Sequence, residues 1–426
     1  MTGVGVTGVG VAGEARPAGA ARAGGGMDSG RMAVDGSAVH GTAPGAAVDG
    51  RTVGAVWTGR PSDAMPTANA NANATGAGTS PAGDAGSAPG EGSAAAQQAG
   101  CMLADTGVVA IGRNEGERLR GCLASVAGRV ACVVYVDSGS TDGSERLARQ
   151  FGAEVVALDM TRPFTAARAR NAGLQRLRER LPGVRRVQFV DGDCEVVPGW
   201  LARAHAFLDA EPRVAAVCGR RRERHPERTV YNRLCDLEWD TPIGEARACG
   251  GDAMMRVEAL AAVGGYRDDL IAGEEPELCV RLRAAGWRVH RLDAEMTRHD
   301  AAMTRFGQWW RRTLRSGYAF AQGAALHGAP PERHWVRETR SALAWGAGVP
   351  LAALVALAVG GAWGALVLLA YPAQVARLAL RAGRSEPLRW RRPLFLVLGK
   401  LPEALGVLRF RLHRMRGRHG ALIEYK

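Results

Sequence analysis

The sequence predicts an α/β fold, in which a Rossmann-like, mainly parallel sheet is flanked by helices and followed by membrane-associated C-terminal helices. Two observations lead to this expectation. Between residues 107 and 193, short apolar runs alternate with helical stretches of about 10–15 residues, as in consecutive βαβ units. Between Ser341 and Ala376 there is no charged residue, and this stretch is nearly twice as long as the about 20 apolar residues that one membrane-spanning helix needs.

Four apolar runs are expected to be the first strands of the sheet. They are VVAIG (Val108 to Gly112), ACVVYVD (Ala131 to Asp137), EVVALD (154–159) and RVQFVDGD (186–193), separated by the helical stretches ERLRGCLASV, ERLARQFG and FTAARARNAGLQRLRERL. The runs are almost continuously apolar, which is typical of strands with both faces covered. In such sheets functional residues follow the carboxyl ends of the strands. Asp137, Asp191 and Asp193 stand at these positions.

The chain divides by composition into four parts. The first part is rich in Ala and Gly and nearly lacks aromatic residues, so it is expected to be disordered because it cannot bury enough apolar area to offset backbone ordering. It is either a genuine tail or the result of an incorrectly assigned start, since Met102 immediately precedes the first patterned strand, and order is expected from Gly107. The expected parts are a tail at 1–104, an α/β domain at 105–335, a hydrophobic hairpin at 336–380 and a basic amphipathic segment at 381–426.

The chain carries 55 Lys and Arg residues against 42 Asp and Glu residues, a net charge of +13. Such an excess fits nucleic acid, an anionic membrane surface or a phosphorylated substrate. The basic residues are scattered and form no recognisable nucleic-acid-binding module, so nucleic acid is not an expected partner. The eight cysteines contain no C-x-x-C pair, which argues against a zinc site or disulfide framework and favours a reducing compartment. No signal-peptide pattern opens the chain.

The uncharged stretch is interpreted as a transmembrane or re-entrant hairpin. Gly360 and Gly361 near its middle favour two short arms, and arginines flank it on both sides. Because basic flanks prefer the cytoplasm, an even number of crossings is expected. This predicts attachment to the inner (cytoplasmic) membrane with the α/β domain facing the cytoplasm, followed by an interfacial basic segment. The alternative is a buried helical hairpin in a soluble protein.

The Asp191-Gly192-Asp193 motif is the principal candidate for chemistry. Two carboxylates one residue apart at a strand end can both reach a divalent cation, and Mg²⁺ or Mn²⁺ takes such oxygen ligands together with a substrate diphosphate. Asp-Gly is also ordinary turn chemistry, which is the alternative for the motif alone.

Other polar residues stand where a nucleotide would bind. Asp137 is placed to contact a ribose or a base edge, and the backbone amides at the start of the following helix could bind phosphate. Residues of the same loop can also cap that helix, and the two roles are compatible. Arg168 and Arg170 near a helix start are either a diphosphate clamp or solvated surface arginines.

Two further segments have no settled role. Trp309 and Trp310 fit an acceptor platform, a membrane-interface belt or core packing. The basic run GRRRERHPER (219–228) is interpreted as a solvated loop in preference to an anionic-lipid or phosphate contact.

Five segments in order resemble the family 2 glycosyltransferases, which have the GT-A nucleotide-sugar fold. They cover roughly residues 107 to 300 and read VVAIGRNEGERLRGCLASV, VVYVDSGSTDGS, AARARNAGL, VQFVDGDCEVVPGWL and CGGDAMMRVEALAAVGGYRDDLIAGEEPELCVRLRAAGWRVHRLDAEMTRHDA. A first βα turn reading GRNEGERLRG lacks the G-x-G-x-x-G spacing of a dinucleotide-binding dehydrogenase, which excludes that alternative.

The resemblance implies roles for individual residues. The nucleotide pocket would be lined by residues after the first strand, the nucleoside would contact Asp137, and the metal would be bound directly by Asp193 and shared with Asp191. A histidine after the last motif can complete the metal or diphosphate site in that family, although a structural role is an equal alternative here. The remaining residues implied are Arg113, Asn114 and Glu115 for the nucleotide, Gly250, Gly251 and Asp252 for the sugar and acceptor pocket, and His299 for the metal.

The segment GEEPEL corresponds to the family's acidic motif, whose second acid deprotonates the acceptor hydroxyl. This implies Glu275 as the general base. The family usually has Asp at that position, so Glu274 is the alternative base. Without a catalytic role, both acids are explained as acidic residues at a helix start, where they interact favourably with the helix dipole. The resemblance thus implies a metal-dependent inverting enzyme that moves a sugar from a UDP- or GDP-type donor to a glycan or lipid-linked acceptor, in cell-envelope or polysaccharide biosynthesis. The alternative is an inactive nucleotide-sugar-binding or membrane scaffold protein.

Overall fold

The computed structural model describes residues 102–382, 386 and 388–417. The expected disordered tail therefore lies outside the described residues except for positions 102–104, and so does the end of the basic segment. The first strand begins at Leu103, earlier than the expected Gly107, because the backbone at Leu103 already pairs with Val130 of the next strand.

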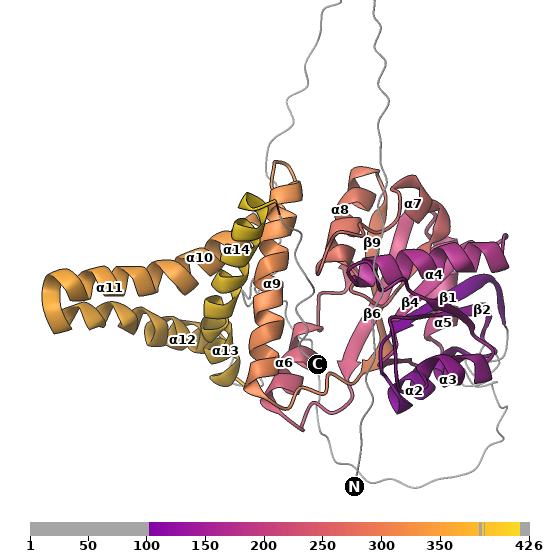
Figure 1. Ribbon diagram of the computed structural model, residues 1–426, viewed down its shortest axis with the longest axis horizontal. Coiled ribbons are helices and arrows are strands. Elements are labelled where there is room, and N and C mark those ends of the chain that lie inside the picture. The colour runs from indigo at the N-terminus through magenta and orange to yellow at the C-terminus, as the bar shows by residue number, and fades with distance from the viewer. Residues whose placement is uncertain (1–101, 383–385, 387, 418–426) are drawn as a thin grey trace, which may run out of the picture. The chain divides into compact units, whose positions relative to one another are not determined.

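A nine-stranded mixed sheet forms the centre of the α/β domain (Figure 1). Its strands are β1 (Leu103–Gly112), β2 (Val130–Asp137), β3 (Glu154–Ala157), β4 (Arg186–Asp191), β5 (Cys194–Val196), β6 (Val214–Glu223), β7 (Gly244–Glu245), β8 (Ala253–Arg256) and β9 (Arg288–His299). The helices of this domain are α2 (Glu117–Val126), α3 (Ser144–Gln150), α4 (Ala166–Arg180), α5 (Trp200–Ala210), α6 (Val230–Glu238), α7 (Val257–Ala262) and α8 (Glu274–Ala284).

The strand order is β3-β2-β1-β4-β8-β6-β9-β5, with β7 paired to β9. The first four strands are parallel, as the alternating strands and helices predict. The second half differs, because β8 runs antiparallel to both β4 and β6, and β5 runs antiparallel to β9. The expected GT-A-like, mostly parallel α/β architecture is therefore confirmed, with antiparallel pairs added in the half that the apolar pattern did not resolve.

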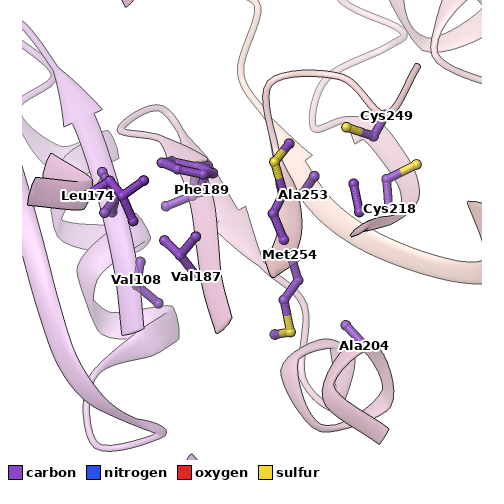
Figure 2. Close-up of a cluster of buried hydrophobic side chains, with 14 of the residues drawn as sticks. Val108, Leu174, Val187, Phe189, Ala204, Cys218, Cys249, Ala253 and Met254 are labelled. Carbon is purple, nitrogen blue, oxygen red and sulfur yellow. The ribbon is translucent and has the colours of Figure 1, made fainter. Parts of the chain in front are cut away.

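One large apolar core lies between the sheet and its helices. Val108, Val187 and Phe189 from neighbouring strands are fully buried in it, with Leu174 of α4 on one side and Ala204 of α5 on the other (Figure 2). Burying branched and aromatic side chains on both faces is what makes these strands continuous apolar runs. The core leaves only the ends of the strands free to carry polar chemistry.

The C-terminal helices follow the domain. They are α9 (Phe306–His327), α10 (Val336–Leu343), the π-helical turn η2 (Ala344–Gly348), α11 (Val349–Gly360), the 3₁₀ helix η3 (Gly361–Leu369), α12 (Ala370–Arg381), α13 (Arg391–Leu398) and α14 (Lys400–Met415). Trp309 of α9 is buried against Phe395 of α13, so of its three predicted roles the structure shows core packing.

α11 and η3 run side by side as a hairpin (Figure 1). The chain reverses at Gly361, whose φ of 60° is a left-handed conformation that glycine adopts readily. Among the described residues, the helical stretch Val336–Arg381 is long and apolar enough to cross a membrane, and only 11% of its most apolar window is buried. The predicted membrane association therefore has a matching element in the structure.

Candidate active site

The carboxyl ends of three strands meet at one edge of the sheet. Gly112 of β1 pairs with Asp137 of β2, and Ile111 of β1 pairs with Asp191 of β4. On the other side of β4, Phe189 pairs with Ala253 of β8, which places Asp252 next to the end of β4. The backbone N–H of Asp191 donates to Oδ1 of Asp252 at 3.0 Å. The acids that the sequence singled out are thus brought together by strand register.

Asp193 and His299 face each other in a buried setting. Oδ2 of Asp193 lies 3.3 Å from Nε2 of His299, because β5, which follows Asp193, pairs antiparallel with the end of β9. On the opposite side of the ring, Nδ1 of His299 lies 3.7 Å from Oε2 of Glu223. Trp239 packs edge-on against the same ring. The imidazole is therefore oriented with Nε2 toward Asp193.

This arrangement fits a divalent cation. Ligand atoms of Asp193, Cys194 and His299 lie within 4.8 Å of one another, as do those of Asp191, Cys194 and Asp252. A carboxylate and a neutral imidazole suit Mn²⁺, and carboxylate oxygens suit Mg²⁺. A metal-binding histidine usually donates its other ring N–H to a carboxylate; the Glu223 carboxylate stands on that side of the His299 ring, 3.7 Å from Nδ1 and beyond hydrogen-bond distance.

Two buried arginines link the acids of the site. Arg170 donates through Nη2 to Asp191 and through Nη1 to Glu274, each at 2.7 Å. Arg221 lies 2.7 Å from Oδ2 of Asp252 and 3.3 Å from Oδ2 of Asp191. Burial by itself lowers the pKa of the Arg170 guanidinium, but the charges of Asp191 and Glu274 outweigh burial and raise that pKa. Both cations therefore stay charged and offset the negative charge of the neighbouring carboxylates.

Helix α4 presents Arg170 to this network. Its N-cap Thr165 accepts a hydrogen bond from the backbone N–H of Arg168, which fixes where the helix begins. The neighbouring Arg168 is buried elsewhere, and its guanidinium donates to the backbone carbonyls of Asp159, Arg162 and Pro163. The structure brings Arg170 to the acids but uses Arg168 to hold the preceding loop, so the two arginines do not form the expected pair.

Asp252 and Gly251 pack against the residues of the site. Asp252 is fully buried, and Oδ2 also accepts from the hydroxyl of Thr297 at 2.7 Å. Gly251 is closely surrounded, since an added Cβ would lie 2.8 Å from Nη2 of Arg170 and 3.3 Å from Oδ2 of Asp191. The carboxylate of Asp252 is enclosed by these protein groups, and its expected contact with the sugar stays a prediction.

The residues predicted to bind the nucleotide shape the neighbouring loops. Asn114, at a φ of 55°, accepts from the backbone N–H of Thr141 through Oδ1, and its own N–H donates to Ser140 Oγ. Oδ2 of Asp137 accepts from the N–H groups of Gly139 and Ser140. The loops after β1 and β2 are therefore joined at the edge where a nucleotide is expected.

The other two residues after β1 differ in exposure. Arg113 is exposed, whereas Glu115 is partly buried and lies 2.8 Å from Arg118. The aliphatic Cγ of Glu115 is close to both Gly112 and Gly192. Glu115 thus stands between the end of β1 and the Asp-Gly-Asp motif, and Arg113 lies at the outer side of the same loop.

Glu274 and Glu275 begin helix α8 but face different surroundings. Glu274 accepts from Arg170 and so belongs to the acidic network. Glu275 is only 4% exposed, and its Oε1 accepts from the backbone N–H of Cys249 and from the thiols of Cys249 and Cys279. That one of the two acids is the base stays a prediction, and the geometry moves our preference from Glu275 to Glu274.

The sequence interpretation missed Arg221, Glu223 and Trp239. The run at 219–228 was expected to be a solvated loop, but its first half is the end of strand β6. Alternate residues of a strand share a face, so Arg221 and Glu223 point to the same side of the sheet. On the neighbouring strand β9, Thr297 is paired with Arg221 and His299 with Glu223. The run of charges hid this alternation, and the i, i+2 spacing was the only available signal.

A family model for glycosyl transferase family 2 matches residues 108–263. The chain is 29% identical over 186 residues to the succinoglycan biosynthesis protein ExoA of Rhizobium meliloti, a match that covers 42% of this chain and 55% of ExoA. It is 24% identical over 219 residues to the glycosyltransferase AglE of Haloferax volcanii, covering 48% of this chain and 69% of AglE. The chain thus matches little more than half the length of ExoA.

A solved structure with a similar fold is the mannosyltransferase PcManGT from Pyrobaculum calidifontis, in complex with GDP-Man and Mn²⁺. The TM-score is 0.51 at 24% sequence identity, and the similarity covers 71% of this chain and 87% of that one. This likeness concerns the fold, and it agrees with the family match and with the order of the motifs along the strands. Residues 108–263 of the chain thus match the model of glycosyl transferase family 2, and the domain that contains them has a GT-A-like fold.

Proposed function

We propose that this protein transfers a glycosyl group from a nucleoside-diphosphate sugar to a hydroxyl acceptor, with inversion at the anomeric carbon, in cell-envelope or polysaccharide biosynthesis. The observation that carries the proposal is the convergence of Asp193 and His299 beside Asp191 at the carboxyl edge of the sheet. Ligands bind at this edge in open α/β sheets. The family match supplies the reaction class, and the site supplies residues suited to it.

Asp193 and His299 are proposed to hold a Mg²⁺ or Mn²⁺ ion, which Asp191 shares. When bound, such an ion neutralises the diphosphate that leaves with the nucleotide. Glu223 and Trp239 flank the His299 ring, whose Nε2 faces Asp193. Arg170 and Arg221 offset the charge of the clustered acids, so that Asp191 stays in place when the donor arrives.

Glu274 is proposed as the general base. Its carboxylate is held by Arg170 at the network that also contains Asp191, which places a proton acceptor on the site side of α8. A base must take the proton from the acceptor hydroxyl as that oxygen attacks the anomeric carbon. The carboxylate of Glu275 already accepts hydrogen bonds from the backbone N–H of Cys249 and the thiol of Cys279. We propose that Glu275 positions the start of α8.

The test of the reaction is a screen of UDP- and GDP-sugars with the full chain and Mn²⁺ or Mg²⁺. GDP-mannose with Mn²⁺ comes first, because PcManGT, the mannosyltransferase with a similar fold, was solved with both. Asp193→Ala is expected to abolish metal-dependent donor turnover, while Asp293→Ala removes an exposed carboxylate of β9 and serves as the control. Unchanged turnover in Asp193→Ala would sink the metal assignment.

The two glutamates are separated by matched amide variants. Glu274→Gln is expected to lower transfer by roughly 10²–10⁴-fold, the usual contribution of a general base, while donor binding is retained. Glu275→Gln keeps most of its hydrogen-bonding capacity and is expected to have a smaller effect on the rate. The opposite order of the two effects would restore Glu275 as the base.

The α11–η3 hairpin is proposed to attach the protein to the cytoplasmic membrane from the cytoplasmic side. The first arm of the hairpin continues without a break from α10 through η2 into α11, and its uncharged part, Ser341 to Gly360, rises about 30 Å, close to the hydrocarbon thickness of a bilayer. This length suits two crossings, and a re-entrant hairpin is the alternative. Both arms return to the same side, which satisfies the basic flanks. A membrane-held enzyme of this kind suits a lipid-linked or polymeric glycan acceptor.

A further inference from the structure

A group of thiols lies buried behind Glu275. Cys249 precedes β8 and Cys279 lies in α8, and their sulfurs are 3.7 Å apart. Each sulfur is 3.0 Å from the same Oε1 of Glu275. Cys218 of β6 is also buried, and it lies with Cys249 at one end of the core (Figure 2).

The spacing of these atoms fits a tetrahedral metal ion. Two sulfurs that each lie about 2.3 Å from a tetrahedral Zn²⁺ are separated by about 3.8 Å, close to the separation of Cys249 and Cys279. The ligand atoms of Cys249, Glu275 and Cys279 all lie within 4.8 Å of one another. A sulfur–sulfur separation of this size needs no movement of the backbone to bring both thiols onto one ion.

We propose that Cys249, Cys279 and Glu275 form a second metal site, which takes a thiophilic divalent cation such as Zn²⁺. Soft thiolates select zinc, whereas the carboxylate and imidazole of Asp193 and His299 suit Mn²⁺ or Mg²⁺. The two sites therefore differ in the class of ion they bind. The proposal goes beyond the proposed transfer reaction and does not depend on it.

Binding exchanges protons for the metal. Each thiol that coordinates Zn²⁺ gives up its proton to solvent, and Glu275 supplies a carboxylate oxygen in place of its present thiol contacts. No oxidation or reduction takes place, because Zn²⁺ keeps its charge.

The ion would join two segments that carry the proposed active site. Cys249 is close in sequence to Asp252, and Cys279 and Glu275 lie on the helix that begins with Glu274. Closing these segments onto one ion stabilises the folded chain over the unfolded chain, since a preformed site exists only in the folded chain. A zinc-dependent rise in the unfolding temperature is therefore expected.

The test uses the full chain, reduced and stripped of metal, with Co²⁺ as a spectroscopic probe and Zn²⁺ as a competitor. Co²⁺ bound by thiolates is expected to show sulfur-to-cobalt charge transfer in the near ultraviolet, and Zn²⁺ is expected to remove this absorption. Cys249→Ser and Cys279→Ser are each expected to weaken Zn²⁺ binding by more than the roughly 10–100-fold that loss of an outer contact causes. Cys235→Ser is the matched control, because Cys235 is also buried but lies outside this group.

The metal centre of the transferase gives a distinct result. If the thiolate absorption survives Cys249→Ser and Cys279→Ser but disappears in Cys194→Ser, the ion sits beside Asp193 and His299 and the proposal is wrong. Should the serine variants fail to fold, X-ray absorption of the zinc-loaded wild-type protein decides. At least two sulfur ligands are expected, and a shell of only nitrogen and oxygen would overturn the proposal, as would the absence of charge-transfer absorption in the wild type.

Discussion

In most soluble proteins charged side chains are exposed and apolar side chains are buried. The carboxyl edge of the sheet and the α11–η3 hairpin both break this rule, but in opposite ways. At the edge, charged side chains are buried, with Asp252 fully enclosed and Asp193 only 5% exposed. On the hairpin, apolar side chains are exposed, with Val359 at 85% and Trp363 at 79%. Buried charges are costly unless they are paired, and large exposed apolar surfaces mark interaction sites.

The two regions differ in where their partners come from. The buried acids are already paired with Arg170, Arg221 and His299. The exposed apolar residues of the hairpin face solvent in the structure, so their proposed partner is the membrane. Removing a partner at the edge is therefore expected to destabilise the fold, whereas a polar residue on the hairpin is expected to change membrane binding alone.

The largest loss of stability is expected for Arg221→Met. This change leaves Asp252 buried without its cation, and breaking a buried pair by removing one partner costs about 3–5 kcal/mol. Arg298→Met removes an arginine that is 59% exposed, whose pair with Glu295 is worth at most about 1 kcal/mol. Urea unfolding of the two variants measures the difference, and equal losses would show that the buried pairing does not stabilise the domain.

A smaller loss is expected for Gly251→Ala. The added Cβ would lie 2.8 Å from Nη2 of Arg170, so the guanidinium must move and its contact with Asp191 is disturbed. Overpacking of this kind costs about 1–3 kcal/mol, and transfer activity should fall with it. Gly183→Ala is the control, because nothing lies within 4 Å of its added Cβ. If both variants keep wild-type activity and stability, close packing at Gly251 is not required.

The smallest effect on folding is expected for Val355→Asp on the hairpin. Val355 is 56% exposed, so the unfolding free energy should change by no more than about 0.5 kcal/mol. Membrane binding should weaken by about 2.5 kcal/mol, since an acid enters the hydrocarbon region. Ile243→Asp, at the same 56% exposure in the α/β domain, should leave flotation with anionic liposomes unchanged. Equal flotation of all three proteins would contradict insertion of the hairpin.

The first half of the sheet was predictable because its signals are local. Each of β1 to β4 contains a mainly apolar run followed by a turn, and parallel register then brings Asp137 and Asp191 to one edge. The family resemblance extended this to the ordered motifs, and the family match confirmed it as far as residue 263. The turn at Gly361 likewise followed from two glycines within an uncharged stretch.

The second half of the sheet was less predictable from the sequence, because it depends on pairing between strands that are far apart in the chain. Arg221 and Glu223 reach the site only through the register of β6 with β9, which no local pattern encodes. Glu274 and Glu275 are adjacent, and neighbouring helical residues point about 100° apart, so the sequence cannot tell which of them faces Arg170. The meeting of Cys249 and Cys279 is likewise a consequence of tertiary packing.

Titration of Mn²⁺ into the full chain, with and without a nucleoside diphosphate, tests the proposed metal centre most directly. Electron paramagnetic resonance of free Mn²⁺ measures binding, and thiolates do not compete for this hard ion. Wild type and Asp293→Ala are expected to bind one Mn²⁺ more tightly when the diphosphate is present. Asp193→Ala and His299→Ala are expected to lose that binding. Equal Mn²⁺ binding by wild type and Asp193→Ala would contradict the assignment of the Asp-Gly-Asp motif as the diphosphate metal site.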